Sequence, residues 1–190
     1  MNKNKELVVH VGPMFSGKTS HMLLDVEKYK HAGREILAYK PKCDDRYAKS
    51  EIVTHMGWSY PAVEVSCGED ITKHILENVK NTNFCLIVVD ELFMIPGAAE
   101  ELIWLHRNSA GVEIVVASLD LSYACKPFDE VSKILPWATR IEKYASACSV
   151  CGNDARFTYR KAEDVSEVLV GGKELYEPRC GEHHPFVKDQ

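Results

Sequence analysis

The stretch from Gly12 to Thr19 constrains this chain more than any other, because it reads Gly-Pro-Met-Phe-Ser-Gly-Lys-Thr. The spacing G-x-x-x-x-G-K-[ST] is typical of a phosphate-binding loop between a strand and a helix. A β-branched run at 6–11 precedes the loop, and apolar residues recur at helical spacing over 19–31 after it. A plain glycine turn with a solvated lysine is the alternative, and both flanks disfavour it. The sequence therefore predicts a nucleoside triphosphate site.

In such a loop the backbone N–H groups and the positive end of the helix dipole face the phosphates. We expect Lys18 to reach the outer phosphates and the Thr19 hydroxyl to bind the Mg²⁺ that accompanies ATP. The predicted phosphate-binding residues are Gly12, Pro13, Met14, Phe15, Ser16, Gly17, Lys18 and Thr19.

Composition excludes several classes of protein. The chain has 190 residues, of which 45% are hydrophobic and 27% charged, as in ordinary globular proteins. A net charge of -5 argues against a protein built to bind nucleic acid, although it leaves a local basic patch open. No run approaches the roughly 18 apolar residues of a membrane span, and the basic start leads into a strand rather than a secretory signal. We therefore expect a cytoplasmic protein with reduced cysteines and no membrane partner.

Alternating strand and helix patterns predict an α/β fold with a mostly parallel sheet flanked by helices. Strands are expected at 6–11, 34–40, 84–89, 112–117 and 139–143, and helices at 19–31, 68–81, 96–108 and 128–135. In the first helix Leu23 and Leu24 are expected to widen the apolar stripe, and in the third Ile103 and Trp104 are expected on a buried side. Residues 52–65 are interpreted as a hairpin or an edge segment.

The continuous apolar run at 84–89 predicts a central strand, and it ends in Asp90 and Glu91. The carboxyl end of this strand should lie beside the phosphate loop, where Asp90 can act on Mg²⁺ directly or through a water. Glu91 is then placed to take a proton from an attacking hydroxyl or water. Taken alone, the two residues could equally be a turn cap and a solvated strand end. The phosphate loop favours the catalytic interpretation.

Two other loops leave the same predicted sheet edge. The loop at 41–50 carries Asp44, Asp45 and Arg46, and it is either a solvated loop or part of the ligand site. The loop after the strand at 112–117 carries Leu119, Tyr123 and Phe128. These three residues could line a flat apolar pocket for a base, but their periodicity alone favours ordinary core.

The last quarter of the chain has the spacing of a zinc site. Cys148 and Cys151 form a C-x₂-C pair, and Cys180 and His183 form a C-x₂-H pair. Two such knuckles joined by a hairpin supply four ligands, which closes the site and makes the metal structural. His184 is a possible substitute for His183, and a redox pair is a less favoured alternative. We expect a nucleotide-binding domain at 1–143 and a zinc-held lid at 144–190.

Together, these motifs resemble the cytosolic-type thymidine kinases, small P-loop (RecA-like) enzymes with a zinc-held lasso. The resemblance rests on 12–19, Asp44 to Tyr47, Asp90-Glu91, Leu119-Asp120 with 126–128, and the zinc pairs that frame Gly171-Gly172. It implies transfer of the γ-phosphoryl group of ATP to the 5′-hydroxyl of thymidine, with Mg²⁺, one structural Zn²⁺ and commonly a homotetramer.

The resemblance also implies roles for residues. Glu91 matches the general base, and Asp44 and Arg46 match residues around the metal and phosphates. The implied thymidine-binding residues are Met14, Leu119, Tyr123, Phe128, Thr158, Arg160, Val168, Val170, Gly171, Gly172 and Tyr176.

The sequence departs from the family pattern after the central strand. The family usually reads D-E-x-Q-F, whereas this chain has Phe93 and Met94 in place of the glutamine and the aromatic residue. This loses an amide donor and a ring near the substrate. Two other functions stay open: another P-loop phosphotransferase such as a nucleotide kinase, and a zinc-ribbon ATPase that binds nucleic acid. The first would need more basic residues for the acceptor's phosphate, and the acidic charge disfavours the second.

Overall fold

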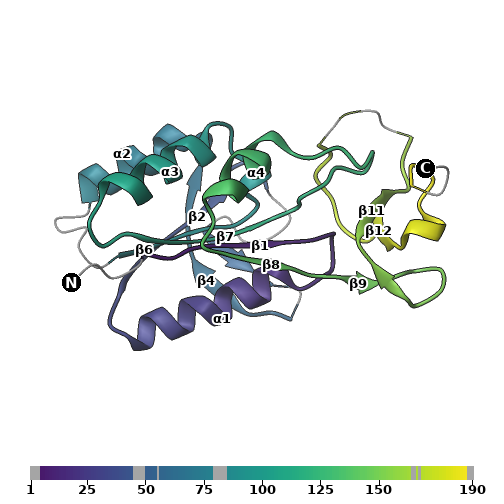
Figure 1. The fold of residues 1–190 in the computed structure, drawn as a ribbon, viewed down its shortest axis with the longest axis horizontal. Coiled ribbons are helices and arrows are strands. Elements are labelled where there is room, and N and C mark those ends of the chain that lie inside the picture. The colour runs from purple at the N-terminus through teal and green to yellow at the C-terminus, as the bar shows by residue number, and fades with distance from the viewer. Residues whose placement is uncertain are drawn as a thin grey trace.

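A central sheet of six parallel strands carries the fold, and helices cover both of its faces (Figure 1). The computed structural model describes residues 5–44, 50–54, 56–78, 85–163, 166 and 168–187. The strand order is β5-β2-β6-β7-β1-β8. This confirms the predicted α/β class with a parallel sheet.

The elements follow the predicted alternation closely. The first part of the chain contains β1 (Leu7–Val11), α1 (Lys18–His31), β2 (Glu35–Pro41), β3 (Glu51–Val53), β4 (Ser59–Pro61), β5 (Val63–Val65), α2 (Gly68–Asn78), β6 (Cys85–Val89), η2 (Leu92–Met94), α3 (Ala98–Asn108), β7 (Glu113–Ser118), α4 (Asp129–Ile134), η3 (Leu135–Trp137) and β8 (Arg140–Lys143). The last part contains β9 (Ser146–Ala147), β10 (Asp154–Ala155), β11 (Phe157–Arg160), β12 (Tyr176–Arg179) and η4 (Gly181–His183).

Both faces of the central strands are buried, because their side chains alternate between two apolar clusters. One cluster joins residues such as Val9, Ile87 and Val116 to α2, α3 and α4. The other joins residues such as Val8 and Val88 to α1. Figure 1 shows the resulting three layers, with α1 on one face and the other three helices on the opposite face.

The segment at 52–65 contains both of the expected alternatives. Strands β3 and β4 form an antiparallel hairpin, and β5 then joins the edge of the main sheet beside β2. Helix α3 begins at Ala98, two residues after the predicted start, because Gly97 takes the left-handed conformation (φ 75°) ahead of it. The predicted positions Arg46, 79–81 and Phe84 lie outside the described residues.

Two predicted buried side chains are wrong. Trp104 is 54% exposed and Leu24 is 52% exposed. Helix α3 packs through the face that carries Ala98, Leu102 and Leu105, and Trp104 lies outside that stripe. Helices α1 and α3 therefore each bury a narrower apolar stripe than the sequence pattern suggested.

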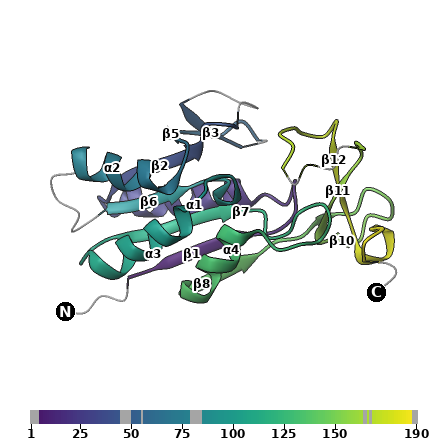
Figure 2. The same cartoon turned by 90° about the horizontal axis from the view of Figure 1, so that it is seen from above.

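The parallel strands bring the predicted site residues to one end of the sheet. The carboxyl ends of β1, β2, β6 and β7 point toward the C-terminal hairpin of β11 and β12, which lies beyond the main sheet in both views (Figures 1 and 2). Among the residues described, no helix has the length and apolar character needed to cross a membrane.

Candidate active site and metal centre

The loop between β1 and α1 has the backbone that the glycine spacing predicted. Gly12 has φ 150°, and a Cβ there would lie 2.6 Å from the carbonyl oxygen of Tyr144, so a larger residue would clash. Gly17 has φ 80° and immediately precedes α1. The loop therefore turns sharply into the helix N-terminus, the geometry that gathers N–H groups around an anion.

Two side chains fold back over this loop. Lys18 Nζ and Ser16 Oγ each donate a hydrogen bond of 2.8 Å to the carbonyl oxygen of Pro13. Lys18 is buried, with 8% of its surface exposed. The ammonium group is thus held at the loop, where phosphates would bind.

Asp90 follows β6 and meets the start of α1. Thr19 Oγ1 donates a hydrogen bond of 3.2 Å to Asp90 Oδ1. Two oxygens that bind one Mg²⁺ at about 2.1 Å in octahedral geometry are about 3 Å apart, so this hydroxyl and carboxylate fit a Mg²⁺ ion.

Glu91 is the next residue, and its backbone is left-handed at φ 50°. Such a conformation is uncommon for a residue with a side chain and is found preferentially at functional sites. The 3₁₀ turn η2 begins directly after Glu91 and leads the chain away from the sheet edge.

Two cavities meet at this edge. The first, here called the apolar cavity, has a volume of about 40 Å³ and is lined mainly by Met, Leu, Val and aromatic side chains. The second, the phosphate-loop cavity, has a volume of about 350 Å³ and lies beside Lys18, Thr19 and Asp90. Met14, Glu91 and Leu119 line both cavities. A carboxylate therefore stands between the apolar cavity and the phosphate loop.

The structure gathers most of the predicted residues around these cavities. The apolar cavity is lined by the predicted Met14, Leu119, Tyr123, Phe128, Thr158, Arg160, Val168, Val170, Gly171 and Tyr176, but not by Gly172. The phosphate-loop cavity is lined by the predicted Met14, Phe15, Gly17, Lys18, Thr19, Asp44 and Asp90. Arg46 lies outside the described residues.

Other lining residues were not among the predicted site residues. Leu121, Ser122 and Leu169 line the apolar cavity, and Lys40 and Lys173 line the phosphate-loop cavity. Lys40 ends up there because it lies near the carboxyl end of β2, a rule of parallel sheets that could have indicated it. Lys173 depends on how the C-terminal segment folds, which no local signal gives.

Phe93 and Met94, the departures from the family pattern, also line the apolar cavity. The Phe93 ring packs on Phe128, with centroids 4.5 Å apart and planes tilted by 38°. The wall that usually offers an amide is therefore entirely apolar at this position.

The C-terminal segment covers the apolar cavity through hydrogen bonds to buried side chains. Met14 N donates to Thr158 Oγ1 at 3.0 Å, which ties β11 to the phosphate loop. Arg160, 5% exposed, donates to the Tyr176 hydroxyl at 3.0 Å and lies 3.9 Å from the centre of the Tyr123 ring. Tyr176 in turn donates to the carbonyl oxygen of Leu169 at 2.6 Å. Arg160 thus joins β11 to β12 and, through Tyr176, to the segment at 168–170.

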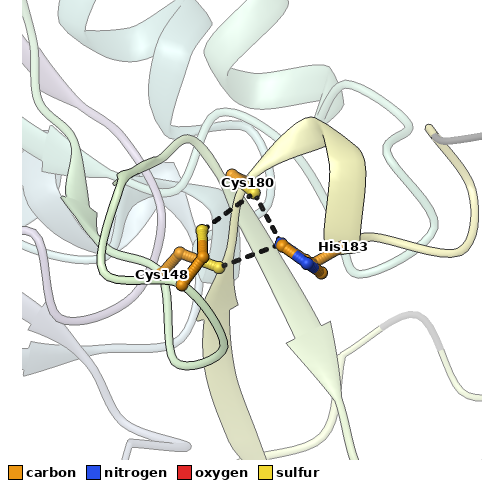
Figure 3. A group of neighbouring side chains, drawn as sticks. Cys148, Cys180 and His183 are labelled. Atoms are coloured by element: carbon orange, nitrogen blue, oxygen red, sulfur yellow. Dashed lines mark hydrogen bonds between the residues drawn. The ribbon is translucent and has the colours of Figure 1, made fainter.

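The four predicted metal ligands form one cluster. The ligand atoms of Cys148, Cys151, Cys180 and His183 all lie within 4.8 Å of one another. His183 Nδ1 is 3.9 Å from Cys148 Sγ and 3.1 Å from Cys180 Sγ (Figure 3), and the sulfurs of Cys151 and Cys180 are 3.8 Å apart. Two ligand atoms of one tetrahedral zinc are about 3.3–3.8 Å apart. The cluster therefore fits a structural zinc site.

The environment of Cys148 favours its metal-binding form. Burial acts to raise the pKa of the Cys148 thiol, but backbone N–H groups of Cys180, Cys151 and Val150 outweigh burial and lower that pKa to about 6. A thiolate is the species that binds zinc. The two knuckles thus present a donor that is prepared for a cation.

The structure also resolves the choice between neighbouring histidines. His184 is fully buried and lies outside the cluster, with Nδ1 3.5 Å from Cys125 Sγ and Nε2 3.3 Å from the carbonyl oxygen of Thr158. His183 is the ligand that the cluster contains.

The model of the thymidine kinase family matches residues 5–184 of the chain. This chain belongs to the thymidine kinase family. It is accordingly an enzyme of the thymidine kinase type. The family resemblance predicted from the motifs is confirmed. Membership implies thymidine and ATP as the substrates.

Proposed function

We propose that this thymidine kinase transfers the γ-phosphoryl group of ATP to the 5′-hydroxyl of thymidine, in the apolar cavity, and forms dTMP. The observation that carries the proposal is the position of Glu91 in the wall shared by the two cavities. A nucleoside in the apolar cavity and a triphosphate on the phosphate loop would both meet this carboxylate. That is the arrangement a general base needs.

The reaction needs positioning and charge neutralisation more than covalent chemistry. The loop N–H groups and Lys18 would hold the phosphates, with Asp44 and Arg46 nearby, and Thr19 and Asp90 would hold the Mg²⁺ that enters with ATP. The 5′-oxygen forms a bond to the γ-phosphorus while the bond from that phosphorus to the bridging oxygen breaks. The Glu91 carboxylate accepts the hydroxyl proton, and ADP leaves.

The lid supplies nucleoside selection in this proposal. The backbone around Thr158 and 168–172 would hydrogen-bond the edge of the base, while Leu119, Phe128 and Phe93 contact its faces. Arg160 holds this segment through Tyr176. Closing the lid excludes water, which limits hydrolysis of ATP.

A panel of acceptors tests the proposal: thymidine, deoxyuridine, deoxycytidine, deoxyadenosine, deoxyguanosine and dTMP, each with Mg²⁺ and ATP. We expect turnover of thymidine and deoxyuridine to the 5′-monophosphates. A wider nucleoside range would assign relaxed selectivity to Phe93 and Met94. Phosphorylation of dTMP alone, or hydrolysis of ATP with no acceptor product, would overturn the acceptor assignment.

We further propose that residues 1–143 form the nucleotide-binding domain and 144–190 the zinc-held lid, and that the enzyme works as a homotetramer in the cytoplasm without nucleic acid. Family resemblance supports the tetramer, and the net charge of -5 supports the absence of nucleic acid. Light scattering coupled to size exclusion tests the oligomer, and salt-dependent binding to DNA tests the partner.

A further inference from the structure

Residues close together in one lid segment line different cavities. Val168, Leu169, Val170 and Gly171 line the apolar cavity, and Lys173 lines the phosphate-loop cavity. Of the described residues beyond Lys143, only Lys173 lines the phosphate-loop cavity. The segment that covers the nucleoside thus also presents one cation to the triphosphate site.

Hydrogen bonds within the lid fix the turn that carries Lys173. The N–H groups of Leu175 and Tyr176 donate to the carbonyl oxygen of Gly172 at 3.1 and 3.0 Å. Lys161 Nζ donates to the carbonyl oxygen of Lys173, and Lys161 N donates to the carbonyl oxygen of Leu175 at 2.8 Å. The turn therefore continues the hairpin of β11 and β12, in which Arg160 pairs with Tyr176.

The cations of this cavity come from two opposed sources. Lys18 and Lys40 are buried in the nucleotide-binding domain, with 8% and 3% of their surfaces exposed. Lys173 is exposed and approaches from the lid. Because the cavity also contains the carboxyl groups of Asp44, Glu51, Asp90 and Glu91, added cationic charge is valuable where a triphosphate must bind.

We propose that Lys173 binds the γ-phosphoryl oxygens of ATP when thymidine in the apolar cavity holds the lid in place, and stabilises the charge on those oxygens during transfer. This proposal rests on the proposed phosphoryl transfer to thymidine. In phosphoryl transfer the charge lies on the three equatorial oxygens, and a cation opposite the phosphate loop stabilises it. Occupation of the nucleoside cavity by thymidine would then deliver a catalytic group to the phosphates, so that transfer is favoured over hydrolysis.

The first test compares Lys173→Ala and Lys173→Arg with Lys73→Ala, which removes an exposed lysine on α2 away from both cavities. We expect kcat of Lys173→Ala to fall about 10- to 100-fold, somewhat below the effect of removing an oxyanion donor. The dissociation constant of thymidine measured without nucleotide should change less than about twofold, since Lys173 does not line the apolar cavity. Lys173→Arg should restore part of kcat. A kcat for Lys173→Ala equal to that of Lys73→Ala would overturn the proposal.

The second test measures binding without chemistry. Calorimetric titration would compare the non-hydrolysable analogue adenylyl imidodiphosphate with ADP, each with and without thymidine. In the wild type, thymidine should strengthen binding of the triphosphate analogue and leave ADP unchanged, and Lys173→Ala should lose this difference. A difference that persists in Lys173→Ala would contradict the role, whereas a wild-type enzyme inactive on thymidine would overturn the proposed function instead. Zinc content and thermal unfolding of each variant confirm that the lid is intact.

Discussion

At the scale of single residues, Glu91 combines the proposed role of general base with an uncommon left-handed backbone. Its φ of 50° costs about 1–3 kcal/mol in a residue other than glycine, and surrounding structure must maintain it. Leu92 is fully buried directly after it, which anchors the turn. The conformation places a carboxylate between two cavities rather than along the line of β6.

Glu91→Gln tests this placement with almost no change in shape. An amide cannot accept the proton of the attacking hydroxyl, so kcat should fall by about 10²–10⁴. Nucleotide affinity and the thermal unfolding temperature should stay near those of the wild type. Steady-state kinetics and calorimetry check both parts, with Glu100→Gln on α3 as the matched control. Near-normal turnover of Glu91→Gln would remove Glu91 from the role of base.

At the scale of elements, the four residues of the predicted zinc site lie before and after the hairpin of β11 and β12. Cys148 and Cys151 lie before β10 and β11, and Cys180 and His183 lie directly after β12. Cys148→Ser should release zinc, because a serine hydroxyl is a poor zinc ligand, and thereby disorder the lid. The thymidine KM should rise several-fold. Metal analysis of the purified variant checks the assignment of the zinc ligands, and an unchanged zinc content would contradict that assignment.

His184 links the hairpin to the loop on the other side of the apolar cavity. Its ring lies between Thr158 of β11 and Cys125, whose loop carries Ser122 and Tyr123 of the cavity wall. The rings of Phe157, Tyr159 and Phe186 surround it. We therefore infer that His184 positions both walls of the apolar cavity.

His184→Phe keeps an aromatic ring and removes both polar contacts. It leaves the buried carbonyl oxygen of Thr158 without this partner, so the free energy of unfolding should fall by about 1–3 kcal/mol. The thymidine KM should rise more than kcat falls, a split that separates wall positioning from chemistry. Cys125→Ser, which retains a polar partner for the ring, is the matched control. Wild-type KM in His184→Phe would exclude the positioning role.

At the scale of the whole molecule, the free energy of unfolding should depend on pH through buried histidines. Burial is the largest effect on His10 and lowers its pKa below 6.5, while Asp25, 3.1 Å away, opposes this. Burial likewise lowers the pKa of His106, whose Nε2 has no hydrogen-bond partner among the described residues. The unfolded chain binds protons at higher pH than the folded chain at both positions.

The sign of the pH dependence follows from these lowered pKa values. Stability is full above pH 6.5 and is lost as the pH falls from 6.5 through the lowered folded values. Urea unfolding at pH 7.5 and 5.5 should therefore show a smaller loss of free energy for His10→Gln than for the wild type. Zinc release at low pH affects both proteins and cancels in the comparison. An equal loss in the two proteins would contradict the prediction.

Much of this architecture could be predicted from the sequence, because long apolar runs indicate buried strands and glycine spacing indicates a tight loop. The runs at β6 and β7 and the loop before α1 are examples. The direction of each side chain was harder to predict. Trp104 lies in an apolar pattern but is exposed, because α3 packs through a different stripe. Strands β9 and β10 span two residues each, too short for any period to show. Lys173 reaches its cavity only through the folded lid.

The parallel order of the sheet has a consequence for synthesis of the chain. Strand β1 pairs with β7, where Leu7 lies opposite Ile114, and with β8, where Val8 lies opposite Arg140. The first contact spans 107 residues (114 minus 7) and the second 132 (140 minus 8). A nascent chain emerging from the ribosome therefore carries β1 with both of its edges open until most of the sheet has been made. Such distant closure slows folding and exposes an apolar strand to aggregation, so the element that bears the nucleotide loop is the one that depends longest on the rest of the polypeptide.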